Sequence, residues 1–519
     1  MKRICVVFRI NSGLRTLTSL FFSAFLIASL SCLNSCNSSG GKYKFQAESM
    51  HWLQFRGPQS SGIAPDDANP PIHFSADTNL LWKTEILPGW SSPCIVNDRI
   101  FLTGFNDADS LLYTFAINRE NGEILWRDSI TPNGFYSMHS INSYANPTIA
   151  SDGKRIFAEF MNYGMICYDL EGNKIWEYPH EMVADFYGGA CSPVIADSIV
   201  VFKVDPEEDC RIMALDCESG DSIWVIRAHE LDLNYFGSNS TIVILNDMMI
   251  LHVSRNLLVV DIPELSVIWR IPIPGNGVAT PVIMDETIFI NSYVQLGEEK
   301  AIGDNRPFKE LVAEIDNNSN GLIEQDEFPD DMLLFSRPEI IDMDRSSMYL
   351  KDDRTFPYID VNEDGSVDEK EWIELWEMMK GFMQEHGMMA VSLEGSGERS
   401  FEDFKWKVNE DTPETPSPLV VEEDVFFIKN GGIATVIQRD SGEVVLHERL
   451  GAPGAYVSSP MLAGNRIYTS SFNGTVTVIS AEDYSVLAQN KLNEKIGASP
   501  AAVDDILYVR TDKHLYAFR

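Results

Sequence analysis

The chain has 519 residues, of which 44% are hydrophobic, and its formal net charge at pH 7 is −37. This apolar content suits a globular protein, whereas the negative charge and the lack of a basic stripe argue against nucleic-acid binding, which requires cations to neutralise phosphates. Five cysteines follow the N-terminal region, an odd number without regular spacing, so we expect buried thiols rather than a disulfide framework.

The N-terminus has the pattern of a secretory signal. A basic start, MKRICVVFRI, precedes an apolar run that is shorter than a membrane-spanning helix requires. Residues 33–36 read LNSC, which resembles the bacterial lipobox, whose cysteine becomes the lipidated first residue. We therefore predict a lipoprotein signal over 1–36 with lipidation at Cys36, followed by a flexible tether over 37–51. A lipobox ending at Cys32 and ordinary signal-peptidase cleavage nearby are the alternatives.

Two phrases recur through the rest of the chain. The first is a small residue and a proline, then an aliphatic strand, a polar turn and a second strand. Its copies lie at Pro93, Pro147, Pro193, near Thr241 (without proline), Pro281, Pro418, Pro460 and Pro500. The second is strand, turn and strand ending at Trp126, Trp176, Trp224 and Trp269, with Leu446 and Leu487 in the tryptophan position of two later copies.

Copies lie 40 to 54 residues apart, with one larger gap of 137, and a period near 45 with about four strands is typical of a β-propeller. In LLYTFAI, larger and smaller apolar residues alternate, so both faces of the sheet can be dry, as a blade between two neighbours requires. The glycine of G-x-x-x-W permits a tight hairpin, and the tryptophan can then cover the next blade.

Eight copies of the first phrase predict an all-β fold, an eight-bladed β-propeller with four antiparallel strands in each blade. The last copy ends without its fourth strand. We expect NLLWKTEI, about residues 79–86 with Trp82 in the docking position, to supply that strand. This would close the ring and remove exposed sheet edges.

These repeats, with the opening WLQFRGPQSSGI and LLWKTEILPGWSSP, resemble the PQQ-like β-propeller family. That family includes quinoprotein dehydrogenases and BamB-type outer-membrane assembly lipoproteins. The resemblance covers residues 52–296, with blades one to five, and 404–519, with the end of blade five and blades six to eight. It implies the fold but no single activity, because the family holds both enzymes and scaffolds.

Residues 297–403 are predicted to be an insertion in blade five, with 29 aspartates and glutamates against 10 lysines and arginines. Its stretches DNNSNGLIEQDE and DVNEDGSVDEKE match the D-x-[DN]-x-[DN]-G-x5-E calcium loop of EF-hands. Alternate oxygens from one winding loop, closed by a bidentate glutamate, suit a hard cation with about seven ligands. The predicted calcium ligands are Asp316, Asn318, Asn320, the Leu322 carbonyl, Glu324 and Glu327, then Asp360, Asn362, Asp364, the Ser366 carbonyl, Asp368 and Glu371.

Apolar residues with helical spacing flank the loops. They are Phe308, Leu311, Val312 and Ile315 before the first loop, and Trp372, Leu375, Trp376 and Met379 after the second. Ile323 and Val367, at position 8 of the loops, can pair as a short β-bridge. We therefore expect a small helical EF-hand pair that binds two calcium ions in a structural role. The alternative is a calcium sensor, which requires a fluctuating ion supply.

A ligand of the propeller would lie at the channel mouth, near the loops that precede each first phrase. Aromatic, amide and histidine side chains in these loops form a possible polar pocket, and plugging of the axis is their alternative role. The candidate residues are Trp90, His139, Asn142, Tyr144, Tyr187, Tyr235 and Tyr456.

The family resemblance implies that a quinoprotein dehydrogenase clamps its cofactor between a tryptophan and, in many members, adjacent disulfide-bonded cysteines. This sequence has no adjacent cysteines, and its recognisable calcium ligands lie in the insertion. PQQ is therefore not an expected cofactor, and no catalytic residue is assigned. We expect a lipid-anchored, exported scaffold of the bacterial envelope, at the outer membrane, with an envelope protein or extracellular ligand as partner. The alternative is a quinoprotein-type oxidoreductase or a carbohydrate-active enzyme.

Overall fold

The structure is a computed structural model of the whole chain. It describes residues 51–184, 188–206, 209–253, 255–273, 275, 278–294, 296–298, 301–337 and 347–519. The predicted signal, both candidate lipidation cysteines and nearly all of the tether lie outside these ranges, whereas His51 already belongs to the first strand. Across the described ranges, no helix has the length and apolarity needed to cross a membrane.

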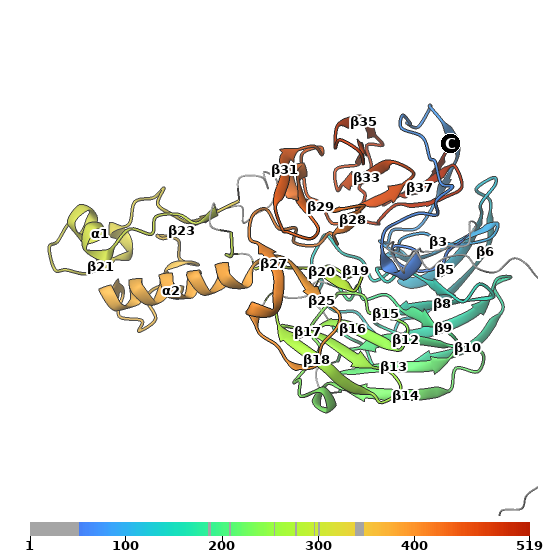
Figure 1. Cartoon of the computed structure of the whole chain (residues 1–519), viewed down its shortest axis with the longest axis horizontal. Helices are drawn as coiled ribbons and strands as arrows, with labels where there is room; N and C mark the ends of the chain where they lie inside the picture. The colour runs from blue at the N-terminus through green and yellow to red at the C-terminus, as the bar shows by residue number, and fades with distance from the viewer. Residues whose placement is uncertain are drawn as a thin grey trace, which may run out of the picture. The chain divides into compact units, whose positions relative to one another are not determined.

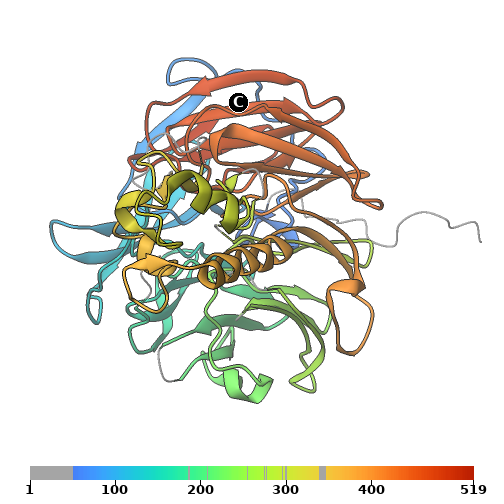
Figure 2. The same ribbon diagram turned by 90° about the vertical axis from the view of Figure 1, so that its left-hand side faces the viewer.

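Eight antiparallel sheets follow one another around a closed ring, as the colour order in Figure 2 shows. The eight-bladed propeller predicted from the repeats is thus confirmed. Blade one contains β3 (Cys94–Val96), β4 (Arg99–Asn106), β5 (Leu111–Asn118) and β6 (Ile124–Ile130), with β1 (His51–Trp52) beside β3. Blade two contains β7 (Ala150–Ser151), β8 (Arg155–Phe160), β9 (Gly164–Asp169) and β10 (Lys174–Pro179). Blade three contains β11 (Val194–Ala196), β12 (Ile199–Val204), β13 (Arg211–Asp216) and β14 (Ser222–Arg227).

The other five blades repeat this order of strands (Figure 1). Blade four contains β15 (Val243–Leu245), β16 (Met248–Val253), β17 (Asn256–Asp261) and β18 (Ser266–Pro272), with β26 (Gly397–Glu398) beside β18. Blade five contains β19 (Val282–Met284), β20 (Thr287–Ser292), β25 (Gly387–Ser392) and β27 (Phe404–Val408). Blade six contains β28 (Leu419–Val421), β29 (Asp424–Lys429), β30 (Ile433–Gln438) and β31 (Val444–Arg449). Blade seven contains β32 (Met461–Ala463), β33 (Arg466–Ser471), β34 (Thr475–Ser480) and β35 (Val486–Lys491).

Blade eight contains β36 (Ala501–Val503), β37 (Ile506–Arg510), β38 (His514–Phe518) and the N-terminal strand β2 (Leu80–Glu85). Strand β2 pairs with β38 so that Trp82 lies opposite Ala517. The predicted ring-closing strand is therefore confirmed. Because strand β2, from the N-terminal part of the domain, shares one sheet with the last strand, β38, the ring has no open end.

A belt of hydroxyl groups also joins all eight blades. In each blade, a serine or threonine precedes the first strand by two residues. Its Oγ accepts a hydrogen bond from the backbone N–H of the equivalent residue in the preceding blade, at 2.9–3.3 Å. The belt residues are Ser92, Thr148, Ser192, Thr241, Thr280, Ser417, Ser459 and Ser499. This belt satisfies one buried N–H in each blade where the strands converge.

Tryptophans seal the outer edges of the blades, as the repeats predicted. The indole N–H of Trp126 in blade one donates to the carbonyl of Leu170 in blade two at 2.9 Å, and its ring covers Gly172. A Cβ atom on Gly172 would lie 2.5 Å from that ring, so the close approach requires glycine. Trp82, Trp176, Trp269 and Trp406 donate to the next blade in the same way.

Blade five contains the insertion, but its C-terminal boundary differs from the prediction. The chain leaves after β20 and returns at Gly387, because β25 pairs along its whole length with β20. The predicted return at residue 404 was therefore wrong. The sequence GMMAVS of β25 directly follows a helix, and its methionines suit a helix as well as a strand. The change from the hydrophobic period of a helix to that of a strand therefore could not be recognised in the sequence.

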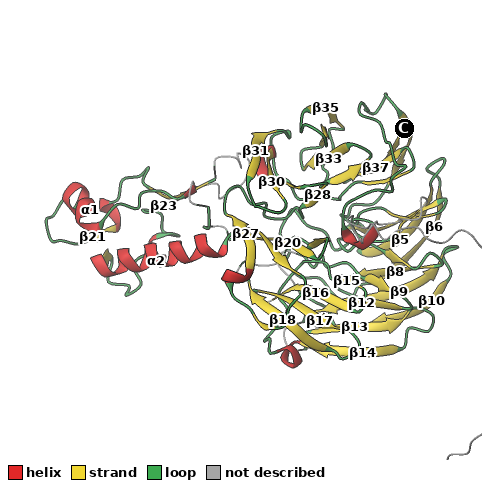
Figure 3. Ribbon diagram, in the orientation of Figure 1, coloured by secondary structure: helices red, strands yellow, loops and turns green. Residues whose placement is uncertain are grey.

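The insertion contains both α-helices of the described chain, α1 (Phe308–Ile315) and α2 (Glu369–Glu385), shown in red in Figure 3. Its short strands are β21 (Ile323–Glu324), β22 (Leu333–Ser336), β23 (Ser347–Tyr349) and β24 (Ser366–Val367). The predicted apolar residues of both helices pack into one core, with Val312 only partly buried at its edge. This core is separate from those of the blades.

The insertion leaves the ring on the same face as the channel-mouth loops. In an antiparallel blade, the second and fourth strands run in the same direction. The connection from strand two to strand three therefore lies on the same face as the connection that enters the next blade. We call this face the mouth face.

Candidate functional site

Two twelve-residue loops in the insertion, loop one (316–327) and loop two (360–371), have matching internal hydrogen bonds. The aspartate at position 1 accepts from the N–H of the glycine at position 6, from Gly321 at 2.8 Å in loop one and from Gly365 at 2.9 Å in loop two. Both glycines have positive φ, 83° and 89°, which the sharp turn requires.

The glutamate at position 12 closes each loop. Glu327 and Glu371 each accept from the backbone N–H groups of positions 2, 3 and 9. The side chains at positions 3 and 5 each accept from the N–H two residues later. The two loops therefore have one conformation, although their sequences differ at eight of the twelve positions.

The loops lie side by side through a two-stranded antiparallel bridge. Ile323 of β21 lies opposite Val367 of β24, which confirms the predicted pairing at position 8, and both side chains are fully buried. Asp368 caps helix α2 by accepting the N–H of Glu371 at 2.8 Å. Helix capping and loop closure thus involve the same residues.

Loop two buries two carboxylates. Asp360 is 6% exposed and Glu371 is 5% exposed, and within the described residues both accept only from backbone N–H groups, with no lysine, arginine or histidine beside them. Burying an ionised carboxylate without a counter-charge is costly. This donor set therefore fits a hard cation bound by oxygen.

Loop one is more open to solvent. Asp316, Glu324 and Glu327 are half-buried, and Asn318 and Asn320 are exposed. The amide Nδ2 atoms of both asparagines donate to Glu324, at 3.0 and 2.7 Å. Across the described part of the chain, no three or more histidine, cysteine, aspartate or glutamate side chains cluster closely enough to hold a metal. The donor sets of the loops combine carboxylate with amide and carbonyl oxygens.

A buried charge network ties the base of the insertion to blade six. Lys429, at the end of β29, lies 2.8 Å from Glu298 at the start of the insertion and 2.6 Å from Asp411. His386, which joins α2 to β25, is fully buried and lies 3.7 Å from Glu298. Although burial opposes it, His386 and Lys429 lower the pKa of Glu298, so this carboxyl is ionised at neutral pH.

Three of the predicted channel-mouth residues, Trp90, His139 and Asn142, make contacts around Ile141. Trp90 and His139 lie on either side of Ile141, since the Trp90 indole donates to the Ile141 carbonyl at 2.8 Å and His139 Nδ1 accepts the Ile141 N–H at 3.3 Å. Asn142 is linked to them through its N–H, which donates to the His139 carbonyl at 3.0 Å. Tyr144 instead packs in an aromatic cluster with Phe105, Phe135 and Tyr136.

Of the remaining three mouth residues, the structure describes Tyr456 and Tyr235. Tyr456 is buried between blades six and seven, where its N–H donates to Asn430 and its hydroxyl donates to the Ala452 carbonyl. Tyr235 is half exposed. Tyr187 lies outside the described residues.

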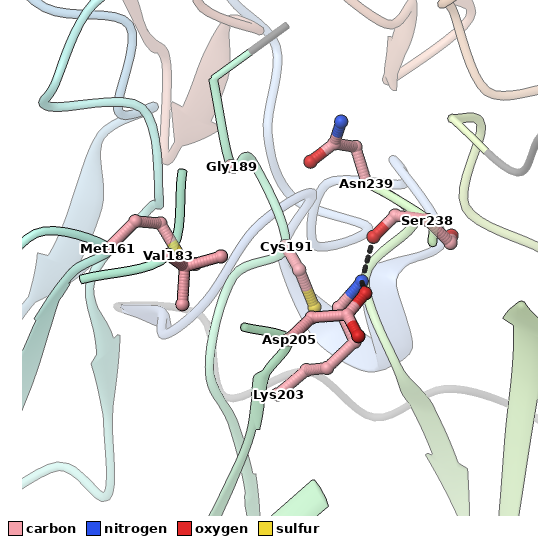
Figure 4. Close-up of a pocket in the computed structure, with 8 residues that line it drawn as sticks. All are labelled: Met161, Val183, Gly189, Cys191, Lys203, Asp205, Ser238 and Asn239. Atoms are coloured by element: carbon pink, nitrogen blue, oxygen red, sulfur yellow. Dashed lines mark hydrogen bonds and ion pairs between the residues drawn. The ribbon is translucent and has the colours of Figure 1, made fainter. Parts of the chain in front are cut away.

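A cavity of about 30 Å³ opens on the mouth face between blades two, three and four (Figure 4). Its lining residues are Met161, Val183, Gly189, Cys191, Lys203, Asp205, Ser238 and Asn239. Lys203 donates to the carbonyl of Ser238 and lies 3.6 Å from Asp205. This volume holds one or two waters. The sequence FKVD, with charges at the end of an apolar strand, is the signal that could have identified Lys203 and Asp205.

The five cysteines in the described domain are free and buried, as expected. Burial raises the pKa of Cys191 to about 11, so its thiol is protonated at neutral pH. Cys191 therefore lines the cavity as a small apolar group.

Several solved structures have a fold similar to that of this chain. A europium-containing methanol dehydrogenase matches with a TM-score of 0.54 and 10% identity, covering 89% of this chain and 89% of that one. A quinohemoprotein alcohol dehydrogenase from Pseudomonas putida HK5 matches with a TM-score of 0.50 and 11% identity, covering 91% and 80%. BamB from Moraxella catarrhalis matches with a TM-score of 0.48 and 9% identity, covering 84% and 98%. At such low identity the likeness shows the fold alone.

No curated protein sequence matches this chain. A family model described as outer membrane protein assembly factor BamB matches residues 108–326 and 383–519. The match spans well over half of the chain, and its break falls inside the insertion. The chain therefore belongs to the PQQ-like propeller family of the outer membrane protein assembly factor BamB.

Proposed function

We propose that this protein is an exported, calcium-binding β-propeller that acts as an interaction scaffold in the bacterial cell envelope. Its family is named for an assembly factor of the outer membrane, which supports a role in holding other envelope proteins. The ring offers a rigid, closed frame, and the insertion adds a second module on its mouth face.

The observation that carries calcium binding is the pair of buried, uncompensated carboxylates in loop two. Asp360 and Glu371 approach full burial, and among the described residues they accept only from backbone N–H groups. A divalent cation would supply the missing positive charge, and the further oxygen ligands would be Asn362, Asp364, the Ser366 carbonyl and Asp368. The matching hydrogen bonds of loop one support a second ion there, held by Asp316, Asn318, Asn320, the Leu322 carbonyl, Glu324 and Glu327.

We assign calcium a structural role. Both loops join the same small core, and α2, which begins at loop two, continues without a linker into β25 of blade five. In an exported protein, sites with dissociation constants of roughly 10⁻⁴–10⁻³ M stay filled. Constant occupancy would hold the acidic insertion in one conformation.

Calcium titration followed by calorimetry tests the sites directly. The wild-type protein should bind two ions, and Glu327→Gln and Glu371→Gln should each remove one. Asp326→Asn and Glu363→Gln are matched controls, because they change the same charge at exposed, non-ligating positions of the loops. Full binding by both ligand variants, or no binding at millimolar calcium, would refute the assignment.

Envelope anchoring and scaffolding need separate tests. Labelling with a fatty-acid analogue in bacteria should modify the wild type and Cys32→Ser but not Cys36→Ser. Crosslinking in intact cells should recover a stable envelope partner. Turnover of an alcohol or sugar with PQQ, calcium and a dye acceptor would instead favour an enzyme and contradict the scaffold role.

A further inference from the structure

One register position of the second strand carries buried polar side chains in nearly every blade. In each blade, the first residue of the first strand pairs with one residue of the second strand. The position lies two residues further along that second strand. All eight residues at this position are 5% exposed or less. They are Thr103, Glu159, Lys203, His252, Asn291, Ile428, Ser470 and Arg510. We call this set the seam ring.

Three members of the seam ring bridge to the next blade by donating hydrogen bonds to backbone carbonyls. Lys203 donates to Ser238, which precedes blade four. Asn291 donates to Pro413, which precedes blade six, at 2.8 Å. Arg510 donates to Ser91, which precedes blade one, at 2.8 Å. At each of these three seams, which are the contacts between neighbouring blades, a side chain of one blade donates a hydrogen bond to a carbonyl of the segment that enters the next blade.

Glu159 is the only acid in the seam ring. It is 1% exposed, and neither of its carboxyl oxygens has a hydrogen-bond partner within the described residues. The nearby cation, Lys203, makes its ion pair with Asp205 instead. An ionised Glu159 would therefore be a buried charge at a position where other blades place donors.

We propose that Glu159 is held as a neutral carboxylic acid that donates a hydrogen bond into the seam between blades two and three, and that this seam loosens when Glu159 ionises. The segment over residues 189–191, which enters blade three beside the cavity, is the counterpart of the segments whose carbonyls accept from Lys203, Asn291 and Arg510 in the other seams. A proton on Glu159 gives this blade the donor that lysine, asparagine and arginine provide elsewhere. The proposal is independent of calcium.

The charged and titratable groups around Glu159 agree with this assignment. Burial raises the pKa of Glu159 well above its usual value, and Lys203 offsets part of that rise. Lys203 is itself balanced by Asp205, and the Cys191 thiol is uncharged. Because the folded pKa exceeds the unfolded one, the protonated acid stabilises the fold fully below the unfolded pKa, near 4.3. This stabilisation falls as pH rises towards the folded pKa.

Glu159→Gln tests the proposal, because glutamine keeps the donor and removes the ionisation. The variant and the wild type should have similar melting temperatures at pH 4.5. At pH 8.5 the variant should melt at least about 2 °C higher. Glu218→Gln, an exposed substitution in blade three, should follow the wild type at both pH values.

Two further readouts decide the protonation state and the opening of the seam. The infrared carbonyl band of a neutral carboxylic acid should be present in the wild type at pH 7 and absent in Glu159→Gln. At pH 8.5, a thiol reagent should label Cys191 several-fold faster in the wild type than in the variant, while buried Cys94 in blade one should react equally in both. A missing infrared band, or identical melting profiles, would overturn the proposal.

Discussion

The ring and the insertion are stabilised by different chemistry. Each blade buries apolar side chains on both faces, so Phe101 and Leu102, which point to opposite faces of β4, are both fully buried. The insertion has one small core and buries Asp360 and Glu371 beside it. The ring therefore depends mainly on apolar packing and hydrogen bonding, whereas the proposed function assigns the insertion a bound cation as the counter-charge of these carboxylates.

Removal of calcium should have the largest effect and should be confined to the insertion. Chelation leaves the loop carboxylates uncompensated, so amides between α1 and the end of α2 should lose nearly all protection from hydrogen exchange. Amides of blades one to three should be unchanged. Equal loss of protection across both regions would contradict the separation of the two modules.

Lys429→Met should detach the insertion from the ring. It leaves Glu298 and Asp411 buried without their shared cation, which costs about 3–5 kcal/mol when one partner of a buried pair is removed. Chemical unfolding and limited proteolysis near residues 298 and 386 would measure this. Lys513→Met, at an exposed position, is the control. If both variants behave alike, Lys429 is not an anchor.

Gly172→Ala should weaken the contact between blades one and two. The added Cβ would lie 2.5 Å from the Trp126 ring, and overpacking costs about 1–3 kcal/mol. Gly153→Ala is a matched control, because Gly153 also has positive φ (+83°) but has open space around its Cβ position. The difference in unfolding free energy between the two variants isolates the clash from the backbone strain, and no difference would show that Trp126 can move aside.

Thr148→Val should have the smallest effect. It removes the acceptor of the Ser92 N–H from the hydroxyl belt, which costs about 1–2 kcal/mol for a buried donor. Thr148→Ser should restore stability, because it keeps the hydroxyl. The melting temperatures of the two variants would check this, and a stable valine variant would show that the belt is dispensable at this blade.

Much of the ring could be predicted because its information is local and repeated. The proline and tryptophan phrases identified the blades, and the position of Trp82 identified the closing strand β2. Similarly, the spacing of Asp316, Gly321 and Glu327 identified a loop whose hydrogen bonds lie within twelve residues. The return of the insertion at Gly387 was missed, because a methionine-rich strand after a helix carries no local signal.

The contacts of the channel-mouth residues could not be predicted, because residue type alone does not show what a loop side chain contacts. Trp90 is placed by its bond to Ile141, 51 residues away in the sequence, and Tyr456 is used in packing between blades. The cavity residues Lys203 and Asp205 lie at the end of one apolar strand, β12. Their role depends on the segment that enters blade four.

The amino-acid sequence by itself determines the number of blades, the alternation that keeps both faces dry, and the spacing of the oxygen donors in the two loops. These properties follow from contacts between residues close in sequence or from a repeated pattern. Only the tertiary structure decides that eight hydroxyl groups form one belt and that Lys429 joins Glu298 to Asp411. It also decides that Glu159 is buried without a hydrogen-bond partner among the described residues. Each of these depends on closing the ring, which brings together groups from different blades that no local pattern relates.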